Sequence, residues 1–269
     1  MGFRFISNDE NEAIIFDDDG LHQASNYWTA ERIENAIPIK ITLPNPAPDL
    51  LKGDFESSEV STADINKPPF NAGGKLFFSQ GGKNYVGSAE FCEHESLILT
   101  AAHCVRDMTT GDWSENIVFK RGYNLLLSKQ IVPVRAVALK SYWYRDKNYC
   151  WDYAFGISNK ASEVDALSSE VSISSGNCTA FGYPSNYNSG EKMKYVYASI
   201  GLNPYAHNNV RMQGNTMGGG CSGGAWTKKD TSVAISLNSF SYAGDDTTLY
   251  GPLLTDDFNK LVEYAKTLL

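Results

Sequence analysis

The sequence lacks both a hydrophobic run that would cross a membrane and a run of basic residues longer than a pair. A spanning helix needs roughly 20 apolar residues, and no stretch approaches that length. The formal net charge is −8, whereas phosphate binding needs a basic patch. The opening residues turn polar too early for a signal peptide. We therefore expect neither nucleic acid nor membrane insertion, and no export address at the start of the chain.

Cysteine is scarce and odd in number, and no two cysteines have the CxxC spacing of a zinc knuckle. An odd count leaves at least one thiol unpaired within the chain. Cys92 and Cys104 flank a predicted strand and are the best candidate disulfide, and two reduced thiols are the alternative. No metal and no cofactor is implied. The five cysteines are Cys92, Cys104, Cys150, Cys178 and Cys221.

The first quarter of the chain reads as an extension that precedes the main fold. Residues 1–23 are acidic and predict an irregular leader with a turn at 17–20. Residues 29–36 predict a short helix that Thr29 caps. Five prolines lie among acids and serines over 44–69, which is typical of a surface linker. Residues 1–69 are therefore expected to be an N-terminal extension or a propeptide-like segment.

From residue 75 the sequence turns into short apolar segments bounded by Gly, Asn, Ser or Pro. The first of them predicts a hairpin around Gly81-Gly82. Many short strands at this spacing favour β-barrels or sandwiches over βαβ units. The last residues differ, because apolar positions recur there at helical spacing. They are Phe258, Leu261, Val262, Ala265 and Leu269. The pattern predicts an all-β fold that ends in a helix.

The segment 218–224, GGGCSGG, has the composition of an acyl-transfer site. Dense glycines allow backbone N–H groups to converge on one point, where a developing oxyanion is held. A flexible glycine loop is an equally good reading of this segment alone. GxSxG is also the nucleophile elbow of α/β-hydrolases, but there a histidine comes last. No histidine follows Ser222, which excludes that elbow and also a papain-like role for Cys221. The order His, Asp, Ser remains.

His103 and Asp152 are the upstream candidates that fit this order. His103 follows an apolar strand and two alanines, which allow close packing around an imidazole. Asp152 lies in WDYAFGI, where strand alternation separates it from the aromatic residues. A buried acid needs a strong hydrogen-bond partner, and an imidazole N–H is one. Each residue also fits a plainer role, His103 as a half-buried structural histidine and Asp152 as an exposed acid on an edge strand.

Together, TAAHC, WDYA and GCSGG resemble the three catalytic signatures of the chymotrypsin-like (trypsin-like) serine peptidases. Within them the chain is most similar to the microbial glutamyl-endopeptidase-like (V8-like) branch, through segments such as YWTAERIENAIPI, FGYP and GGGCSGGAW. The resemblance implies two six-stranded antiparallel β-barrels with the site between them. Residues 70–160 would form the first barrel, and residues 161–269 the second barrel and the C-terminal helix.

The resemblance also implies a function and its residues. Ser222 would be the nucleophile, His103 the general base and Asp152 the group that orients the base, while the N–H groups of Gly220 and Ser222 would form the oxyanion hole. The expected activity is that of a monomeric serine endopeptidase acting on protein or peptide substrates. A catalytically inactive binding module on this fold, or an esterase with the same triad, are the alternatives. The family suggests secretion, but without a signal peptide an intracellular location stays open.

The specificity pocket departs from the family pattern. Residue 216, six before the nucleophile, is Thr where trypsin-type enzymes carry an Asp, which argues against Arg or Lys specificity by that route. The strand predicted to line the pocket, 235–240, has no histidine, which puts Glu specificity in doubt. We expect a small polar pocket formed by Thr216, Asn238, Ser239 and Thr248.

Cys221 directly precedes the proposed nucleophile. A buried structural thiol is the favoured reading. Half of a disulfide, an oxidation-sensitive brake and a cysteine nucleophile are the other readings. The last is disfavoured because Gly-Gly follows Ser222, in the register of the serine enzymes.

Overall fold

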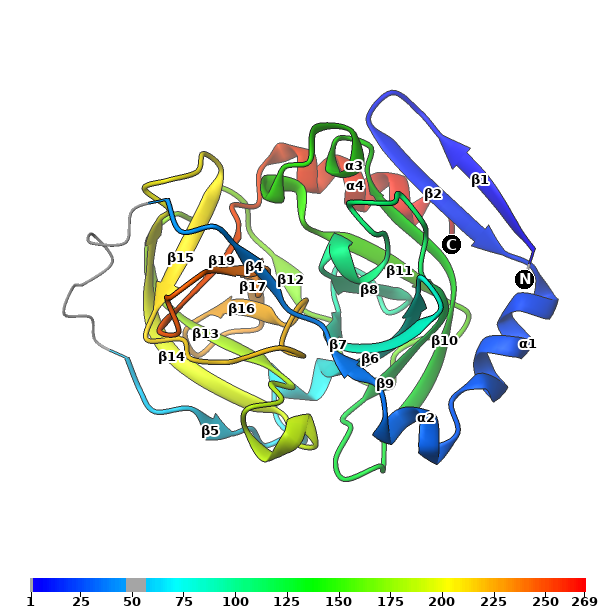
Figure 1. The fold of residues 1–269 in the computed structure, drawn as a ribbon, viewed down its shortest axis with the longest axis horizontal. Coiled ribbons are helices and arrows are strands. Elements are labelled where there is room, and N and C mark those ends of the chain that lie inside the picture. The colour runs from blue at the N-terminus through cyan, green and yellow to red at the C-terminus, as the bar shows by residue number, and fades with distance from the viewer. Residues whose placement is uncertain (1, 47–56) are drawn as a thin grey trace.

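The computed structural model describes residues 2–46 and 57–269, which form two β-sheet bodies that lie side by side (Figure 1). The first body contains a closed barrel, because β9 pairs with both β6 and β10. Neighbouring strands in this barrel are antiparallel. Its six strands are β6 (Gly73–Gln80), β7 (Lys83–Phe91), β8 (Leu97–Thr100), β9 (Glu115–Arg121), β10 (Gln130–Lys140) and β11 (Ala154–Ser158).

The β6–β7 hairpin shows how local sequence specifies this barrel. Gly81 and Gly82 have φ angles of +57° and +75°, in the left-handed region that glycine adopts without steric cost. Gln80 pairs with Lys83 across the two-residue turn. The hairpin expected around these two glycines is therefore confirmed.

The second body is a half-barrel. Its core strands form consecutive antiparallel pairs, but no ladder joins β17 to β19 within the described ranges. The all-β prediction with antiparallel barrels is confirmed, with the second barrel left open. Its strands are β12 (Ser168–Ser169), β13 (Gly176–Gly182), β14 (Lys194–Leu202), β15 (Asn209–Gln213), β16 (Ala225–Lys228), β17 (Val233–Leu237), β18 (Phe240–Tyr242) and β19 (Thr248–Pro252).

The N-terminal extension adds strands to both sheets. The irregular leader expected for 1–23 is wrong, because β2 pairs with β10 and β1 pairs with β2. Asp17 does not begin a turn but caps a helix, since its Oδ1 accepts from Gly20 N at 2.8 Å. The elements are β1 (Phe3–Ser7), β2 (Asn11–Phe16), α1 (Asp18–Tyr27), α2 (Ala30–Glu34), β3 (Ile37–Pro38), β4 (Ile41–Leu43) and β5 (Ser61–Thr62).

Two further expectations for the extension have different outcomes. The helix over 29–36 is confirmed as α2, with the Thr29 side chain accepting from Arg32 N. The linker expected over 44–69 lies partly outside the described residues, which stop at 46 and resume at 57. The described remainder includes β5, which pairs with β14.

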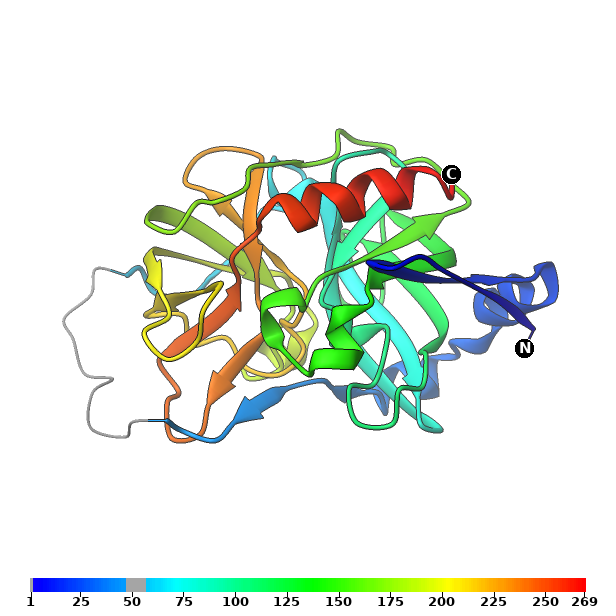
Figure 2. The ribbon, with the colours of Figure 1, turned by 90° about the horizontal axis from the view of Figure 1, so that it is seen from above.

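The C-terminal helix α4 (Asp256–Lys266) follows the second sheet in sequence but packs on the first barrel. Phe258 lies against Tyr153 and Phe155, with ring centroids 5.4 and 5.5 Å apart. The predicted helix is confirmed, and Figure 2 shows it lying mostly over the first-barrel side. The remaining helical turns are α3 (Tyr142–Asp146) and the 3-10 turns Phe70–Ala72, Ala102–Cys104, Tyr149–Trp151 and Asn188–Gly190.

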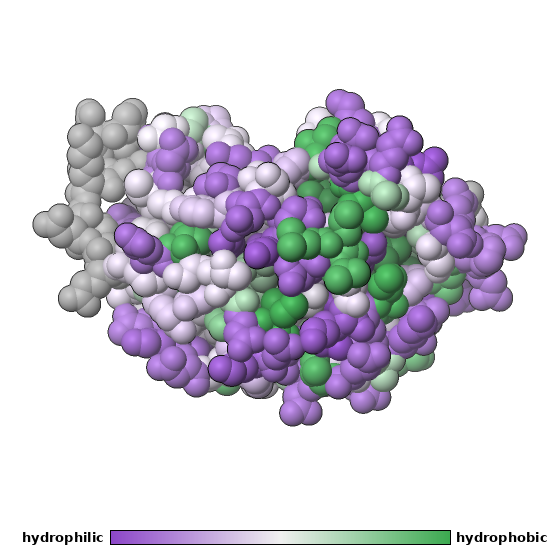
Figure 3. Space-filling view, turned by 90° about the horizontal axis from the view of Figure 1, so that it is seen from below, coloured by the Kyte–Doolittle hydropathy of each residue, from purple (hydrophilic) through white to green (hydrophobic). Residues whose placement is uncertain are grey.

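The outer surface is mixed. Seen from below, apolar side chains gather right of the middle, on the first-barrel side, while the rest of that face is largely polar (Figure 3). The β9–β10 loop contributes exposed leucines at 125, 126 and 127. No helix within 2–46 and 57–269 has both the length and the apolar character needed to cross a bilayer.

Candidate functional site

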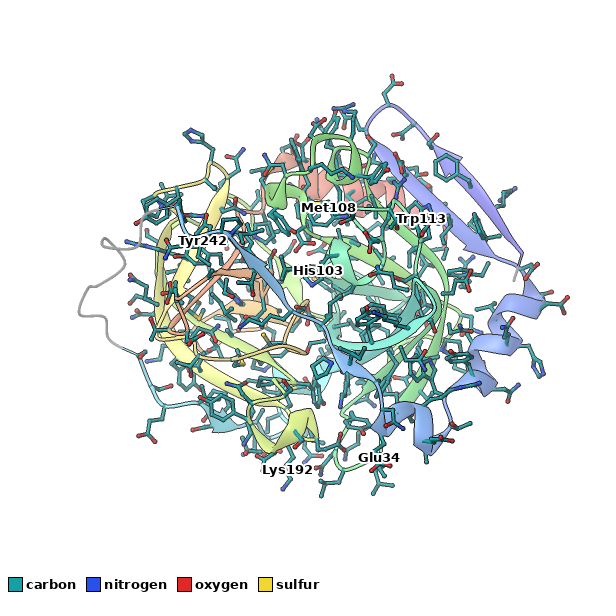
Figure 4. All side chains as sticks on the ribbon, in the orientation of Figure 1. Glu34, His103, Met108, Trp113, Lys192 and Tyr242 are labelled. Atoms are coloured by element: carbon teal, nitrogen blue, oxygen red, sulfur yellow. The ribbon has the colours of Figure 1, made fainter. Side chains whose placement is uncertain are left out.

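His103 and Asp152 come together because the strands that carry them are neighbours. His103 lies in the turn after β8, and Asp152 lies just before β11. These strands are antiparallel, with Thr100 opposite Ala154, so the end of one meets the start of the other. Asp152 is therefore not inside the strand, as its alternation pattern suggested, but in the turn that precedes it. Figure 4 labels His103 near the middle of the molecule.

Asp152 is fully buried and accepts three hydrogen bonds. Its Oδ2 lies 2.8 Å from His103 Nδ1, and its Oδ1 accepts from the His103 backbone N at 2.9 Å. The Ser239 hydroxyl donates to Oδ2 as well. A buried carboxylate is stable as an anion only with such partners. The arrangement fixes the imidazole orientation, and Ser239 both contacts Asp152 and lines a narrow recess that reaches Ser222.

The charge of Asp152 also acts on the protonation of His103. Burial of the ring lowers the pKa of His103, but the Asp152 carboxylate and the adjacent Cys104 together raise it by more, and the pKa lies above 6.5. His103 Nε2 is buried and has no hydrogen-bond partner among the described residues. One ring nitrogen is thus held by the carboxylate while the other is free to take up a proton.

Ser222 sits on a turn that only glycines permit. Gly223 has φ +90°, and a Cβ there would lie 2.3 Å from the Ser88 carbonyl oxygen. Gly220 has φ +92°, and its Cβ would lie 2.6 Å from the Tyr183 carbonyl oxygen. The Ser222 carbonyl accepts from Ser88 N at 2.7 Å and from the Cys104 thiol at 3.9 Å. The turn is therefore clamped against the first barrel, directly beside the residue that follows His103.

The N–H of Gly220 and the hydroxyl of Ser222 both donate to one atom of the N-terminal extension. That atom is the carbonyl oxygen of Ile39, at 2.8 Å from Gly220 N and 3.4 Å from Ser222 Oγ. No hydrogen bond joins Ser222 Oγ to His103 Nε2 in the part of the chain that the structure describes. One proposed oxyanion-hole donor, the Gly220 N–H, and the hydroxyl of the proposed nucleophile thus already face a carbonyl of the chain itself.

Residues 37–43, which we call the strap, carry this carbonyl across the cleft. The strap begins with β3, which runs parallel to β7, and ends with β4, which runs parallel to β18. Figure 1 shows it in blue, crossing the front from one sheet to the other. Ile39 N donates to Val86 O at 3.0 Å, and Ala243 N donates to Leu43 O at 2.8 Å. The strap is therefore held by backbone hydrogen bonds on both sides of the site.

The side chains of Ile39 and Lys40 in the strap lie on opposite sides of the site. Ile39 is buried and its Cγ2 lies on the first-barrel side, near Gly87. The next residue, Lys40, lines the cavity on the second-sheet side. Ile39 thus supplies the carbonyl that accepts from Gly220 N, and Lys40 supplies the side chain that lines the cavity.

All five cysteines are buried free thiols, so the candidate pair Cys92–Cys104 is not a disulfide in this structure. The Cys221 thiol donates to Met217 O at 3.8 Å. Burial raises the pKa of Cys221 to about 12, which keeps the thiol protonated at neutral pH. These contacts favour the structural-thiol reading and weigh against a cysteine nucleophile.

The residues proposed for the pocket do not all line the same cavity. Thr216 and Thr248 line a cavity of about 460 Å³, which shares Gly218 and Gly219 with a narrower recess that reaches Ser222. Asn238 is buried and engaged internally, since its side chain binds Trp226 Nε1 at 2.7 Å and Phe181 O at 3.0 Å. Sequence reasoning missed Ser241 and Asp245, which also line the cavity. Neither lies in a motif: Ser241 is in the short strand β18, and Asp245 is in the loop that follows this strand.

Metal-binding geometry is absent from the described ranges, where no three His, Cys, Asp or Glu side chains cluster as a metal site.

No protein-family description matches the sequence, and no curated protein sequence does either. Solved structures do match. The thermostable serine protease AL20 from an extremophilic microorganism shares 23% identity and a TM-score of 0.68, over 73% of this chain and 97% of that one. The protease Anisep from Arthrobacter nicotinovorans shares 25% identity and a TM-score of 0.66, over 72% and 94%. A Glu endopeptidase shares 16% identity and a TM-score of 0.64, over 77% and 96%.

Proposed function

The chain has the chymotrypsin-like serine-protease fold, and we propose that it is a serine endopeptidase of protein or peptide substrates. The observation that carries this proposal is the buried His103–Asp152 pair with an unoccupied Nε2, one residue from the Cys104 thiol that contacts Ser222. The three similar structures described above are proteases, which supports a peptide substrate.

The chemistry follows from the roles of these groups. His103 Nε2 accepts the Ser222 proton as the hydroxyl oxygen attacks the peptide carbonyl carbon. The N–H groups of Gly220 and Ser222 stabilise the negative charge on the carbonyl oxygen. His103 then gives its proton to the leaving amine, and water hydrolyses the acyl-enzyme with the same histidine as base. Asp152 fixes the ring and stabilises the imidazolium throughout.

With the strap docked against Gly220 and Ser222, the proposed enzyme is latent. Ile39 O occupies the position in which Gly220 N–H would hold a substrate carbonyl, and the Ser222 hydroxyl donates to it. Residues 1–69 therefore act as a propeptide-like segment, with the strap as its inhibitory part. The same occupancy is the one observation that favours the alternative of an inactive binding module, whose cleft would be filled permanently.

A fluorophosphonate probe that labels reactive serines tests the nucleophile. Wild type, Ser222→Ala and Cys221→Ala are compared, and only Ser222→Ala should lose labelling altogether. Labelling that follows Cys221 instead of Ser222 would contradict the assignment. Cleavage of a protein substrate as well as small esters separates an endopeptidase from an esterase.

Two substitutions on the strap test the latency. Ile39→Ala removes a buried side chain and should weaken docking of the strap, so labelling should accelerate by roughly 10- to 100-fold. Ile37→Ala is the matched control, because this isoleucine is 45% exposed and two residues away. If both variants label at the wild-type rate, the strap does not limit access. If the Ile39→Ala variant, which we call the strap-weakened chain, is not labelled and does not cleave protein, the inactive-module alternative replaces the proposal.

A further inference from the structure

The cavity of about 460 Å³ beside Ser222 lies in the second body. Its wall includes the loop between β18 and β19, residues 243–247. Gly218 and Gly219 line both this cavity and the narrower recess that reaches Ser222. A substrate side chain next to the scissile bond would therefore enter this cavity.

Three polar atoms of the cavity-lining side chains have no hydrogen-bond partner within residues 2–46 and 57–269. They are Ser241 Oγ, Asp245 Oδ2 and Thr248 Oγ1, on side chains that are 4%, 6% and 2% exposed. A carboxylate only accepts hydrogen bonds, and hydroxyl oxygens can accept them. Buried polar atoms left unpaired are costly. All three atoms are thus available to a guest that brings hydrogen-bond donors.

The loop between β18 and β19 holds Asp245 in place. Asp245 Oδ1 accepts from Thr247 N at 3.0 Å and from Thr247 Oγ1 at 2.9 Å, which leaves Oδ2 without a partner. Thr247 O in turn accepts from Gly214 N at 2.7 Å, which ties the loop to the end of β15. Asp245 forms no ion pair within the described ranges, and the neighbouring Asp246 adds a second acid to the lining.

We infer that this cavity binds a cationic side chain of the substrate, arginine or lysine, through Asp245, an inference that rests on the proposed peptidase function. A guanidinium has five donors and an ammonium three, which suits three acceptors around one negative charge. The cavity has the size of an ordinary side-chain or ligand pocket. Thr216 argued against basic specificity from the sequence, but the structure supplies the acid from a different loop.

The first test measures binding without catalysis. The aromatic amidine p-aminobenzamidine and its neutral analogue p-aminobenzamide are titrated into the full chain carrying Ile39→Ala, with fluorescence as the readout. The amidine should bind and the amide should not. Asp245→Asn should weaken amidine binding roughly 100-fold. Asp230→Asn removes the same charge from an exposed residue outside the cavity and should change binding by less than about threefold. Equal binding of both ligands, or full binding by Asp245→Asn, would overturn the inference.

The second test measures cleavage by the same chain. Three peptides differ only in carrying arginine, citrulline or glutamate at the cleaved position. Arginine should be preferred over citrulline by roughly 100-fold, and Asp245→Asn should remove the preference by lowering only the arginine rate. A preference for citrulline or glutamate, with Ser222 still labelled by the probe, would overturn the pocket assignment and leave the peptidase standing. If no peptide is cleaved and no label is taken up, the peptidase fails, and amidine binding still decides the pocket.

Discussion

The two ends of the cleft each bury a carboxylate, but they treat it differently. Asp152 accepts hydrogen bonds from the His103 ring, the His103 backbone and the Ser239 hydroxyl. Asp245 has one oxygen bonded to Thr247, and its other oxygen has no hydrogen-bond partner in the described chain. The hydrogen bonds of Asp152 are thus satisfied within the chain, whereas Asp245 Oδ2 would be satisfied only by a ligand. We call these the complete end and the open end of the cleft.

This difference separates orientation from recognition. A catalytic base needs its geometry fixed before substrate arrives, because reorganisation during the reaction raises the barrier. A specificity site gains selectivity when its polar atoms are satisfied by the right guest alone. The strap lies between the two ends, where its Ile39 carbonyl accepts from Gly220 N, and it supplies no partner to Asp245 Oδ2 in the described chain.

The largest expected effect is at the complete end. Asp152→Asn keeps the shape of the side chain but removes the charge that holds the imidazole, so kcat should fall roughly 10⁴-fold. Initial rates on a neutral peptide measure this in the strap-weakened chain. Asp245→Asn is the control, because it should keep its rate on that peptide. Equal losses in the two variants would erase the contrast between the ends.

The pH profile gives the next largest effect. His103 must be neutral to accept the Ser222 proton, and burial lowers its pKa while Asp152 and Cys104 together raise it by more, to above 6.5. Activity should therefore rise with pH as His103 loses its proton, with a midpoint above pH 6.5. Below that midpoint the rate should fall about tenfold for each pH unit. In Asp152→Asn the burial remains without the carboxylate, so the limb should move to lower pH. Profiles of kcat/KM from pH 5 to 10 check both, and a wild-type limb at or below 6.5 contradicts the assigned sign.

Ser239→Ala should have a smaller effect at the same end. It removes one of three hydrogen bonds to Asp152, and bonds to charged groups contribute about 1.5 to 3 kcal/mol, so kcat should fall roughly tenfold or somewhat more. The pH limb should also move upward, because a carboxylate with fewer hydrogen bonds attracts the His103 proton more strongly. A loss confined to KM would place Ser239 in the pocket alone.

The smallest effect is expected at the open end. Thr248→Val removes one unpaired acceptor and keeps the side-chain shape, so arginine preference over citrulline should fall by roughly fivefold. The rate on the citrulline peptide should not change. If the substitution instead slows both peptides equally, Thr248 supports the fold and does not contact the guest.

Much of the fold was readable from local pattern. The Gly81-Gly82 hairpin and the C-terminal helix follow from turn chemistry and from 3.6-residue spacing. The leader was not readable, because β2 is a strand through its pairing with β10, about 125 residues later in the chain. Short polar-flanked segments carry no sign of such distant partners.

The sequence by itself identified the groups that we propose do the chemistry. His103, Asp152 and Ser222 lie in motifs whose glycines and small residues are needed beside the reacting atoms, so the residue types reveal the roles proposed for them. Tertiary structure decided what these groups face. The strap contacts Gly220 and Ser222 through the Ile39 carbonyl, a backbone atom that any residue has, and Asp245 reaches the cavity because Thr247 and Gly214 anchor its loop. Contacts made by backbone atoms and loop placement leave no residue signature, so only the folded chain shows them.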